Sequence, residues 1–574
     1  GLGIPAEPLF RSIPFEKTCV DTLILSQSLL SIRKHSLDAA ASHLGLPEFR
    51  HHRASDDALT CGMLLEAFFA RLRPKGADHI RQLGPIISEL RRDYDGKRQP
   101  KHIIILVKEQ QGIRNLYELV SRSHLEHFKK YPIIPKSLLM ELRDGLILGS
   151  ACEAGEVFRA VTGRRSMREL RRVASFYDFL EIQPLCNNAF LIRSGTASGE
   201  EELRDYNRKM IKLGRLLDKP VVATGDVHFL EPHEEKFRRI LLSNKFSDCD
   251  EPLPLYFKTT AEMLEEFAYL GEETAREVVV DNPNRIAEMI QEVAPLPTGL
   301  FPPKIENSEQ QLKDLCYGKM HRLYGDEPPK LVVDRMEEEL GNICSRGYDV
   351  IYMSAVKLVQ KSNEAGYLVG SRGSVGSSLV AYMSGITEVN ALPAHYRCPR
   401  CRHVDFASGE KYACGADMPD AICPVCGEKL TKDGYNIPFE TFLGFGGDKV
   451  PDIELNFSGE YQARAHRDTI ELFGAEHVFR AGTIGTIAEK TAYGYVKKYN
   501  EERGIHVTKV EENRLAAGFT GVKRTTGQHP GGLVVIPQDK SIYDFCPVQH
   551  PADDPDTDII TTHFEYHSME SNLL

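Results

Sequence analysis

Two carboxylates spaced two residues apart offer the clearest chemistry in the sequence. Asp452 and Glu454 lie in the segment Pro-Asp-Ile-Glu-Leu-Asn-Phe at residues 451–457, where acidic and apolar residues alternate. This alternation predicts a half-buried strand that places both carboxylates on one face. Adjacent like charges are unfavourable unless cations bind between them, and two divalent ions about 4 Å apart are the usual arrangement for phosphoryl transfer. The pair therefore predicts a two-metal site, with a solvated strand face as the alternative.

A loop of glycine and serine residues lies upstream of this segment. It covers residues 369–378, between a short predicted strand at 367–369 and a helical run at 379–383. Glycines let a backbone approach an anion, and the amides at a helix N-terminus point toward it. We expect the loop to hold a phosphate group, with Arg372 adding positive charge. A flexible turn is the alternative.

A third segment, residues 521–532, is rich in glycine, hydroxyl groups and positive charge. This composition predicts a turn that contacts a nucleic-acid backbone or a triphosphate. A predicted basic helix precedes it and carries Lys490, Lys497 and Lys498, for which a solvated helix face is the alternative.

Four cysteines have the spacing of a metal site. Cys398 and Cys401 form one C-x-x-C pair, and Cys423 and Cys426 form a second pair 21 residues further along. Two such turns complete a tetrahedral set of thiolates, which is typical of structural zinc. Reduced cysteines without a ligand are the alternative, and Cys414 between the pairs is predicted to be a spare thiol. This clustering suits a reducing cytosol better than a disulfide framework.

The composition sets broad limits on the class of protein. A length of 574 residues predicts roughly three to five domains. No apolar run approaches the ~20 residues that span a bilayer and no signal peptide opens the chain, so we expect a cytoplasmic protein without a membrane partner. The net charge of −11 argues mildly against nucleic acid as a partner, although a local basic groove would suffice to bind it. Because neither terminus has an obvious cap or tail, the chain is expected to be a fragment.

The predicted elements divide the chain into regions. Residues 1–75 look helical, and from about residue 100 to residue 300 short apolar strands alternate with amphipathic helices. That alternation predicts parallel βα units, in an open sheet or a barrel. Residues 305–365 look helical with charged faces, as in the run Glu337-Glu338-Glu339, and mixed α/β sequence follows. The predicted strands of the βα region lie at residues 103–107, 146–148 and 221–224.

Several long strings together resemble the PolC-type alpha subunits of DNA polymerase III, the C-family replicative polymerases of low-GC Gram-positive bacteria. The resemblance runs from residue 1 to residue 574. The matching strings are YLVGSRGSVGSSLVAYMSGITEVN, the two CPxC pairs, PFETFLGFGGDKVPDIELNFSGEYQ, RAGTIGTIAEKTAYGYVK and TGVKRTTGQHPGG.

The resemblance implies a multidomain α/β protein. Its parts would be the C-terminal remnant of a DEDD 3′–5′ exonuclease, a distorted βα-barrel PHP (polymerase and histidinol phosphatase) domain, the start of a polymerase-beta-like palm, a zinc-binding insertion, and the continuation of the palm. The last part would include a small thumb-like region and stop before the fingers. In this order the parts would occupy residues 1–75, 76–300, 301–394, 395–435 and 436–574.

The resemblance also implies roles for residues of the palm. Asp452 and Glu454 would be the first two magnesium ligands, although the family usually has Asp at the second position. The family's third carboxylate would lie just past residue 574, so the chain alone is expected not to polymerise DNA. The incoming triphosphate would be held by Gly373, Ser374, Gly376 and Ser377. Nucleotide or DNA would be contacted by Lys490, Lys523, Arg524 and His529.

Two further metal sites are implied outside the palm. In the exonuclease part, His52 would be a general base and Asp57 a metal ligand, although a capping turn before a helix would explain the same H-x₄-D spacing. In the PHP domain, Asp226 and His228 follow a predicted strand, at the place where barrel ligands lie. Glu181 would be the third ligand, and the metal would be zinc or manganese. A structural role is the alternative for this D-x-H motif.

The implied function is DNA-directed DNA polymerisation in chromosomal replication, with 3′–5′ exonuclease activity in the full-length enzyme. Two magnesium ions would support transfer of a nucleotide from a dNTP to the 3′-OH of primer–template DNA. The implied partners are a sliding clamp and other replisome proteins. Two alternatives stay open: a metal-dependent phosphoesterase centred on Asp226 and His228, and a catalytically silent module whose zinc insertion grips duplex DNA.

Overall fold

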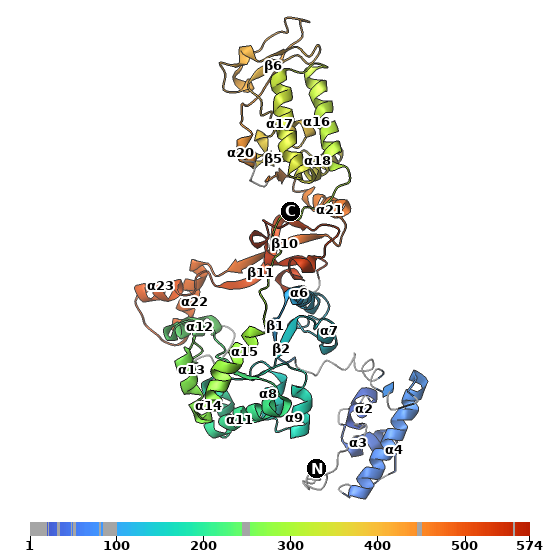
Figure 1. The fold of residues 1–574 in the computed structure, drawn as a ribbon, viewed down its shortest axis with the longest axis vertical. Coiled ribbons are helices and arrows are strands. Elements are labelled where there is room, and N and C mark those ends of the chain that lie inside the picture. The colour runs from blue at the N-terminus through green and yellow to red at the C-terminus, as the bar shows by residue number, and fades with distance from the viewer. Residues whose placement is uncertain are drawn as a thin grey trace. The chain divides into compact units, whose positions relative to one another are not determined.

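Figure 1 shows the fold, which is that of a computed structural model. The structure describes residues 100–243, 253–444, 451–554 and 557–573, together with parts of 20–86. The chain divides into two compact units, Gly1–Lys101 and His102–Leu574. Both helices and strands are present, so the prediction of a mixed α/β protein is confirmed.

The first unit is helical where it is described, as predicted. On α4, Leu64, Phe68 and Leu72 are buried at intervals of one helical turn and form a small core with Leu25. Gly76, with a φ of +88°, ends the short 3₁₀ turn that follows α4. The helices are α2 (Thr22–Leu29), α3 (Leu37–His43) and α4 (Ala54–Leu72).

The region from residue 102 to about residue 290 alternates strands and helices, as predicted. Leu148, Leu180 and Val221 of successive strands join one apolar core with residues of the covering helices. The strands are β1 (Ile104–Val107), β2 (Leu146–Gly149), β3 (Leu180–Ile182) and β4 (Val221–Ala223). The helices are α6 (Gln110–Leu125), α7 (Lys136–Glu141), α8 (Glu156–Thr162), α9 (Met167–Ala174), α10 (Phe190–Arg193), α11 (Glu200–Leu217), α12 (Glu235–Leu242), α13 (Thr260–Glu266), α14 (Glu272–Arg276) and α15 (Asn282–Glu288).

The strand directions correct one prediction. β3 and β4 are parallel, and a parallel bridge from Gly149 to Phe179 links β2 to the start of β3. β1 and β2, however, pair in antiparallel fashion, with Val107 opposite Leu146, so the prediction of parallel units throughout is wrong here. Two helices, α6 and α7, separate these strands. The chain therefore enters β2 at the same end of the sheet at which it left β1. A closed barrel is not present among the strands of the described ranges.

Helices α16 (Ser308–Tyr324), α17 (Lys330–Ser345) and α18 (Asp349–Glu364) occupy the region predicted to be helical, and they lie together in Figure 1. Their apolar faces form one core with the short helix α19 (Leu379–Ser384), which matches the predicted helical run. The predicted charged face is wrong at one position. Glu339 is fully buried, whereas Glu337 and Glu338 are exposed, because Glu339 faces the N-terminus of α19.

A three-stranded antiparallel sheet lies beyond α19, in the cysteine-rich segment. Its order is β7-β6-β8, from β6 (His395–Arg397), β7 (Val404–Asp405) and β8 (Thr431–Asp433). The short helix α20 (Glu440–Leu443) follows, and its Phe442 and Leu443 return the chain to the core of α16–α19.

The last region contains a four-stranded sheet of order β11-β10-β13-β12. The predicted turn at residues 521–532 is wrong, because most of it lies in β11, a 13-residue strand paired with β10. Only His529–Gly532 leave the ladder, since Gly482 pairs with Gln528 and Arg480 with Leu533. The strands are β10 (Val478–Thr486), β11 (Lys523–Val535), β12 (Val548–Gln549) and β13 (Thr561–Glu565), and the helices are α21 (Gln462–Phe473), α22 (Glu489–Glu502) and α23 (Lys509–Ala517). Among the described residues, no helix is both long and apolar enough to cross a membrane.

Candidate active site

The glycine–serine loop and the acidic segment lie side by side. β5 (Gly370–Arg372) pairs in antiparallel fashion with β9 (Glu454–Asn456), and the register places Arg372 opposite Glu454. The loop continues from β5 as a 3₁₀ turn, Gly373–Ser377, and leads directly into α19. Gly373 has a φ of +79°, a conformation that a side chain disfavours. Two motifs about 80 residues apart in sequence therefore meet at one short ladder.

The acidic segment has the two faces that its alternation predicts. Ile453 and Leu455 pack against the core of α16–α19. Asp452 and Asn456 point away from this core and are exposed, and Glu454 between them is half-buried. Both carboxylates are thus on the outer face, where ions and substrates can reach them.

Arg372 forms an ion pair with Glu454. Its Nε and Nη2 lie 2.7 Å and 2.6 Å from the same carboxylate oxygen, Oε2. The Arg372 side chain is 71% exposed and that of Glu454 42%, so water screens the pair. Within the described chain, Asp452 has neither an ion pair nor a side-chain hydrogen bond. A cation that binds Glu454 must therefore compete with Arg372, whereas Asp452 has no such competitor.

The predicted DNA-contacting residues lie along the β10–β11 ribbon. Lys523 pairs with Thr486 at the end of β10, and Lys490 follows in the first turn of α22. The Arg524 guanidinium lies 5.4 Å from the centre of the Tyr495 ring of the same helix. Three cations therefore gather at one end of the ribbon. Lys497 and Lys498 pair instead with Glu501 and Glu502, which supports the solvated helix face for these two residues.

His529 lies apart from these cations, within β11 but in the stretch His529–Gly532 that is not paired with β10. Its Nδ1 accepts hydrogen bonds from the amides of Gly531 and Gly532, at 3.3 Å and 2.7 Å. Its ring is 5.6 Å from that of Tyr566. An Nδ1 that accepts hydrogen bonds leaves Nε2 to carry the proton, and Nε2 is the atom that can donate to a ligand.

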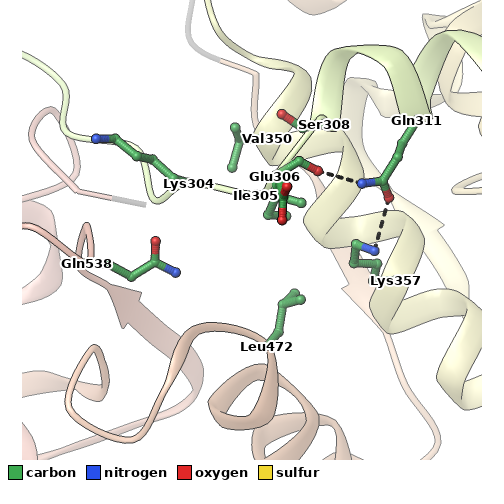
Figure 2. A pocket seen from close by; sticks show the side chains of 9 residues that line it. All are labelled: Lys304, Ile305, Glu306, Ser308, Gln311, Val350, Lys357, Leu472 and Gln538. Atoms are coloured by element: carbon green, nitrogen blue, oxygen red, sulfur yellow. Dashed lines mark hydrogen bonds between the residues drawn. The ribbon is translucent and has the colours of Figure 1, made fainter.

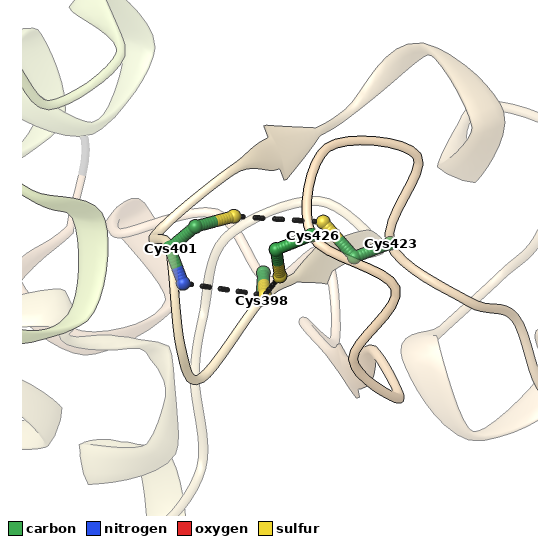
Figure 3. A group of neighbouring side chains, drawn as sticks. All are labelled: Cys398, Cys401, Cys423 and Cys426. Atoms are coloured by element: carbon green, nitrogen blue, oxygen red, sulfur yellow. Dashed lines mark hydrogen bonds between the residues drawn. The ribbon is translucent and has the colours of Figure 1, made fainter.

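The four cysteines come together as predicted (Figure 3). Their sulfur atoms all lie within 4.8 Å of one another, with Cys398 and Cys426 separated by 3.4 Å and Cys401 and Cys423 by 3.5 Å. A zinc ion bound at about 2.3 Å by each of four thiolates separates the sulfurs by about 3.8 Å. The donor set therefore fits a tetrahedral metal ion.

The two cysteine turns have the same backbone design. The amide of Cys398 donates to the carbonyl of His403 and that of Cys423 to the carbonyl of Glu428, both at 2.8 Å. The residue after each second cysteine is left-handed: Arg402 has a φ of +65° and Gly427 a φ of +77°. Although desolvation opposes ionisation of Cys398, the amides of Cys401 and Arg400 lower its pKa, whereas the pKa values of Cys401 and Cys426 are raised. The first proton of the cluster is therefore lost most readily from Cys398, and a bound cation would favour the thiolate form of the others.

The exonuclease motif is described only in part. Asp57 lies in the first turn of α4, where its amide donates to the carbonyl of Arg53. His52 lies outside the described residues.

The predicted metal ligands of the βα region are Glu181, Asp226 and His228, which lie toward the C-terminal ends of β3 and β4. In the described ranges they do not come close enough together to form a three-ligand cluster. Glu181 is buried in β3, and its Oε1 accepts a hydrogen bond of 2.7 Å from Thr224. Burial raises the pKa of Glu181, and the nearby charge of Asp226 adds to this effect. Asp226 follows β4 with a left-handed φ of +48°, and the His228 side chain is exposed.

Two further residues at this end of the strands, His102 and Cys152, were not predicted from the sequence as site residues. His102 precedes β1 and Cys152 follows β2, and their Nδ1 and Sγ atoms lie 3.3 Å apart. Burial raises the pKa of Cys152 to about 12, and smaller contributions come from Glu153 and then Asp226. Because β1 is antiparallel to β2, the first residue of β1 lies at the same end of the strands as the last residues of β2, β3 and β4. His102 could be placed near Cys152 from the sequence only if the antiparallel direction of β1 had been predicted.

Glu181→Gln is expected to make stability less dependent on pH. Because the folded pKa of Glu181 is raised, this group contributes stability that is complete below its unfolded pKa and is lost as the pH rises through the folded pKa. Glutamine keeps an oxygen for Thr224 but does not ionise. Thermal unfolding in metal-free buffer between about pH 4 and pH 8 should show a smaller loss of Tm in the variant than in the parent. Glu273→Gln, at an exposed position, is the control, and identical profiles for all three proteins would contradict the expectation.

A cavity of about 730 Å³ lies away from these motifs (Figure 2). In it, Lys357 donates to the Gln311 side chain at 3.2 Å, and that amide donates to the Glu306 carbonyl at 2.6 Å. No predicted site residue lines the cavity, and two of its lining side chains, Lys304 and Ser308, pair with Asp539 and Asp349 outside the lining. The cavity therefore does not coincide with the predicted site. The lining residues are Lys304, Ile305, Glu306, Ser308, Gln311, Val350, Lys357, Leu472 and Gln538.

Two family models match parts of the chain, and curated relatives match almost all of it. The family model of the bacterial DNA polymerase III alpha NTPase domain matches residues 310–574, and that of the PHP domain matches residues 51–183. The chain is 53% identical to a DNA polymerase III PolC-type of Clostridium perfringens, over 97% of this chain and 38% of that protein. It is 55% identical to one of Caldanaerobacter subterraneus subsp. tengcongensis, over 97% of this chain and 40% of the relative. The chain thus spans about two fifths of the length of these relatives.

Proposed function

Because the chain belongs to the PolC-type DNA polymerase III family, over a segment of its relatives, we propose that the β5–β9 ladder is the nucleotidyl-transfer site of a DNA-directed DNA polymerase. The observation that carries the proposal is the pairing of Arg372 with Glu454 in this ladder. It brings a loop suited to phosphate next to carboxylates suited to divalent ions. The substrates are a dNTP and primer–template DNA.

Asp452 and Glu454 supply the oxygen atoms for two magnesium ions. When bound, these ions would lower the pKa of the primer 3′-OH and neutralise charge on the triphosphate. The loop residues hold the triphosphate in line with the primer end, and Arg372 adds positive charge at the same place. These loop residues are Gly373, Ser374, Gly376 and Ser377. Glu454 is longer by one methylene than the Asp usual in the family, and its extra reach also allows the ion pair with Arg372.

Arg372→Ala is expected to raise the affinity of the site for Mn²⁺ by about two- to fivefold, the range that an exposed ion pair of this kind contributes. Without the guanidinium, Glu454 is free to bind the ion. Electron paramagnetic resonance of free Mn²⁺ would measure the affinity in the 574-residue chain, and Arg346→Ala, at the exposed C-cap of α17, is the control. If Asp452→Ala in the same titration leaves Mn²⁺ binding intact, the proposed site is wrong. Weaker binding in Arg372→Ala would contradict competition by Arg372.

The other assignments extend this proposal. Lys490, Lys523 and Arg524 contact DNA phosphates, which their exposure at one end of the ribbon supports. His529 lies on the same strand and contacts the nucleotide or DNA. The four cysteines bind structural zinc in the insertion, residues 395–435. In the replicative polymerase, the sliding clamp and other replisome proteins are the protein partners, and the protein acts in the cytoplasm.

The first 300 residues carry the accessory sites. We assign residues 76–300 to the PHP domain and propose that zinc or manganese binds near Glu181, Asp226 and His228, although the described strands do not close into a barrel. The contact between His102 and Cys152 at the same end of the strands supports two more ligands there. Residues 1–75 are the C-terminal part of a proofreading exonuclease, to which His52 and Asp57 contribute.

A further inference from the structure

Two charged residues of α17 contact the end of the glycine–serine loop and the start of α19. Arg335 and Glu339 are one helical turn apart and form an ion pair. The Glu339 side chain is 0% exposed and that of Arg335 21%. A buried ion pair of this kind is costly to desolvate, and apolar residues of similar volume often replace one without loss of stability. Its hydrogen bonds therefore suggest a conformational role.

Glu339 holds the start of α19. One of its oxygens, Oε2, accepts from the Ser378 hydroxyl at 2.9 Å and from the amide of Val380 at 3.0 Å. Ser378 is the N-cap of α19 and also accepts from the amide of Ala381. A carboxylate from another helix thus satisfies a helix N-terminus that is itself buried.

Arg335 holds the end of the loop. Its Nη2 donates to the carbonyl of Ser377 at 2.9 Å and to that of Ile437 at 3.1 Å. The same guanidinium donates through Nε to Glu339. Ser377 in turn donates from its hydroxyl to the carbonyl of Ser374 at 2.7 Å, within the turn. One pair of side chains therefore fixes both the last loop residue and the first turn of the helix after it.

We propose that Arg335 and Glu339 are positioning residues that hold the loop at residues 373–378 in the conformation that receives a triphosphate. The inference rests on the proposed function and deepens it, since neither residue contacts the nucleotide. The loop is a single 3₁₀ turn between a three-residue strand and a six-residue helix, and the bonds from Arg335 and Glu339 add to its own backbone hydrogen bond from Ser378 to Val375. Loss of the pair should leave the site's ligands in place but make the loop mobile.

The test compares three glutamate variants of the 574-residue chain. Glu339→Ala removes both hydrogen-bond acceptors. Glu339→Gln keeps one oxygen for Ser378 and Val380 at nearly the same volume. Glu338→Gln makes the same chemical change at the neighbouring exposed position and is the control. The first readout is amide hydrogen exchange at residues 373–381, and the second is the affinity for dATP with Mn²⁺.

We expect Glu339→Ala to speed exchange at residues 373–381 and to weaken dATP binding about tenfold or more, as loss of hydrogen bonds to a charged group implies. Glu339→Gln should recover only the part of both effects that depends on Ser378 and Val380, because its NH2 group cannot accept from Arg335. Glu338→Gln should match the parent. In a polymerase of the relatives' length, the KM for dNTP should rise more than kcat falls, with unchanged affinity for DNA. If Glu339→Ala does not fold, Arg335→Lys, which keeps the charge but cannot reproduce the planar guanidinium's simultaneous bonds from Nε to Glu339 and from Nη2 to the carbonyls, should show the same faster exchange.

The outcomes separate the inference from the function on which it rests. A parent chain that binds no dATP would refute the proposed function, while the exchange data would still report on the loop. A parent that binds dATP, together with a folded Glu339→Ala or Arg335→Lys whose exchange and affinity equal those of the parent, would overturn the positioning role.

Discussion

In a polymerase that contains this chain and has the full length of its relatives, Asp452→Ala is expected to abolish nucleotide incorporation. The affinity for DNA should not change. Asp452 is exposed on the outer face of the acidic segment and has no protein partner in the described chain, so its oxygens are available to a metal ion. Loss of a metal ligand removes several kcal/mol of transition-state stabilisation, and each 1.4 kcal/mol is a factor of ten. We therefore expect a decrease of roughly a thousandfold or more. Primer extension with radiolabelled dNTP measures the rate, and fluorescence anisotropy of a labelled primer–template measures DNA binding.

Two variants on the same ladder provide the controls. Asn456→Ala changes an exposed residue on the same face without removing a carboxylate, and it should keep most of the activity. Glu454→Asp restores the residue that the family usually has, and it should retain or increase the rate. Incorporation that survives Asp452→Ala would remove the basis for the assignment of the site.

Cys423→Ser should release one zinc ion per chain and unfold the insertion at residues 395–435. The small apolar cluster of this segment contains Cys398 and Cys423 themselves, so few other contacts hold its turns together. Structural zinc sites contribute about 10–16 kcal/mol of apparent binding free energy, which is folding free energy when no site exists without the metal. Zinc content by mass spectrometry and limited proteolysis of the insertion would follow both effects.

Cys414 is the matched control for this prediction. It lies between the two pairs but bonds to Asp417, at 3.4 Å, and does not belong to the quartet. Cys414→Ser should keep the zinc and the resistance to proteolysis. A parent chain purified without zinc, or an insertion that stays folded in Cys423→Ser, would refute a structural metal at this place.

Short-range patterns predicted much of the candidate site. The alternation at residues 451–457 gave the two faces of the acidic segment, because a strand repeats every two residues whatever its partner. The C-x-x-C spacing gave the cysteine quartet, because two residues between thiolates suit one turn around an ion. The strand predicted at residues 367–369 lies slightly later in the structure, at Gly370–Arg372.

Features that depend on distant contacts could not be predicted in this way. The direction of β1 relative to β2 depends on the two helices that connect them, α6 and α7. The contact between His102 and Cys152 follows from that direction. Glu339 stands in a run of three glutamates that is typical of a solvated helix face. Its burial depends on the N-terminus of α19, which lies about 40 residues further along the chain. The segment at residues 521–528 has a turn-like composition, but pairing with β10 makes it a strand.

The most direct test of the proposed site is the position of bound Mn²⁺ and nucleotide. Anomalous diffraction from crystals of the chain grown with Mn²⁺ and a non-hydrolysable dNTP would locate both. We expect manganese at the carboxylates of Asp452 and Glu454, with the triphosphate along Gly373–Ser377 and the Arg372–Glu454 ion pair broken. Manganese and triphosphate bound elsewhere, with that ion pair intact, would contradict the account.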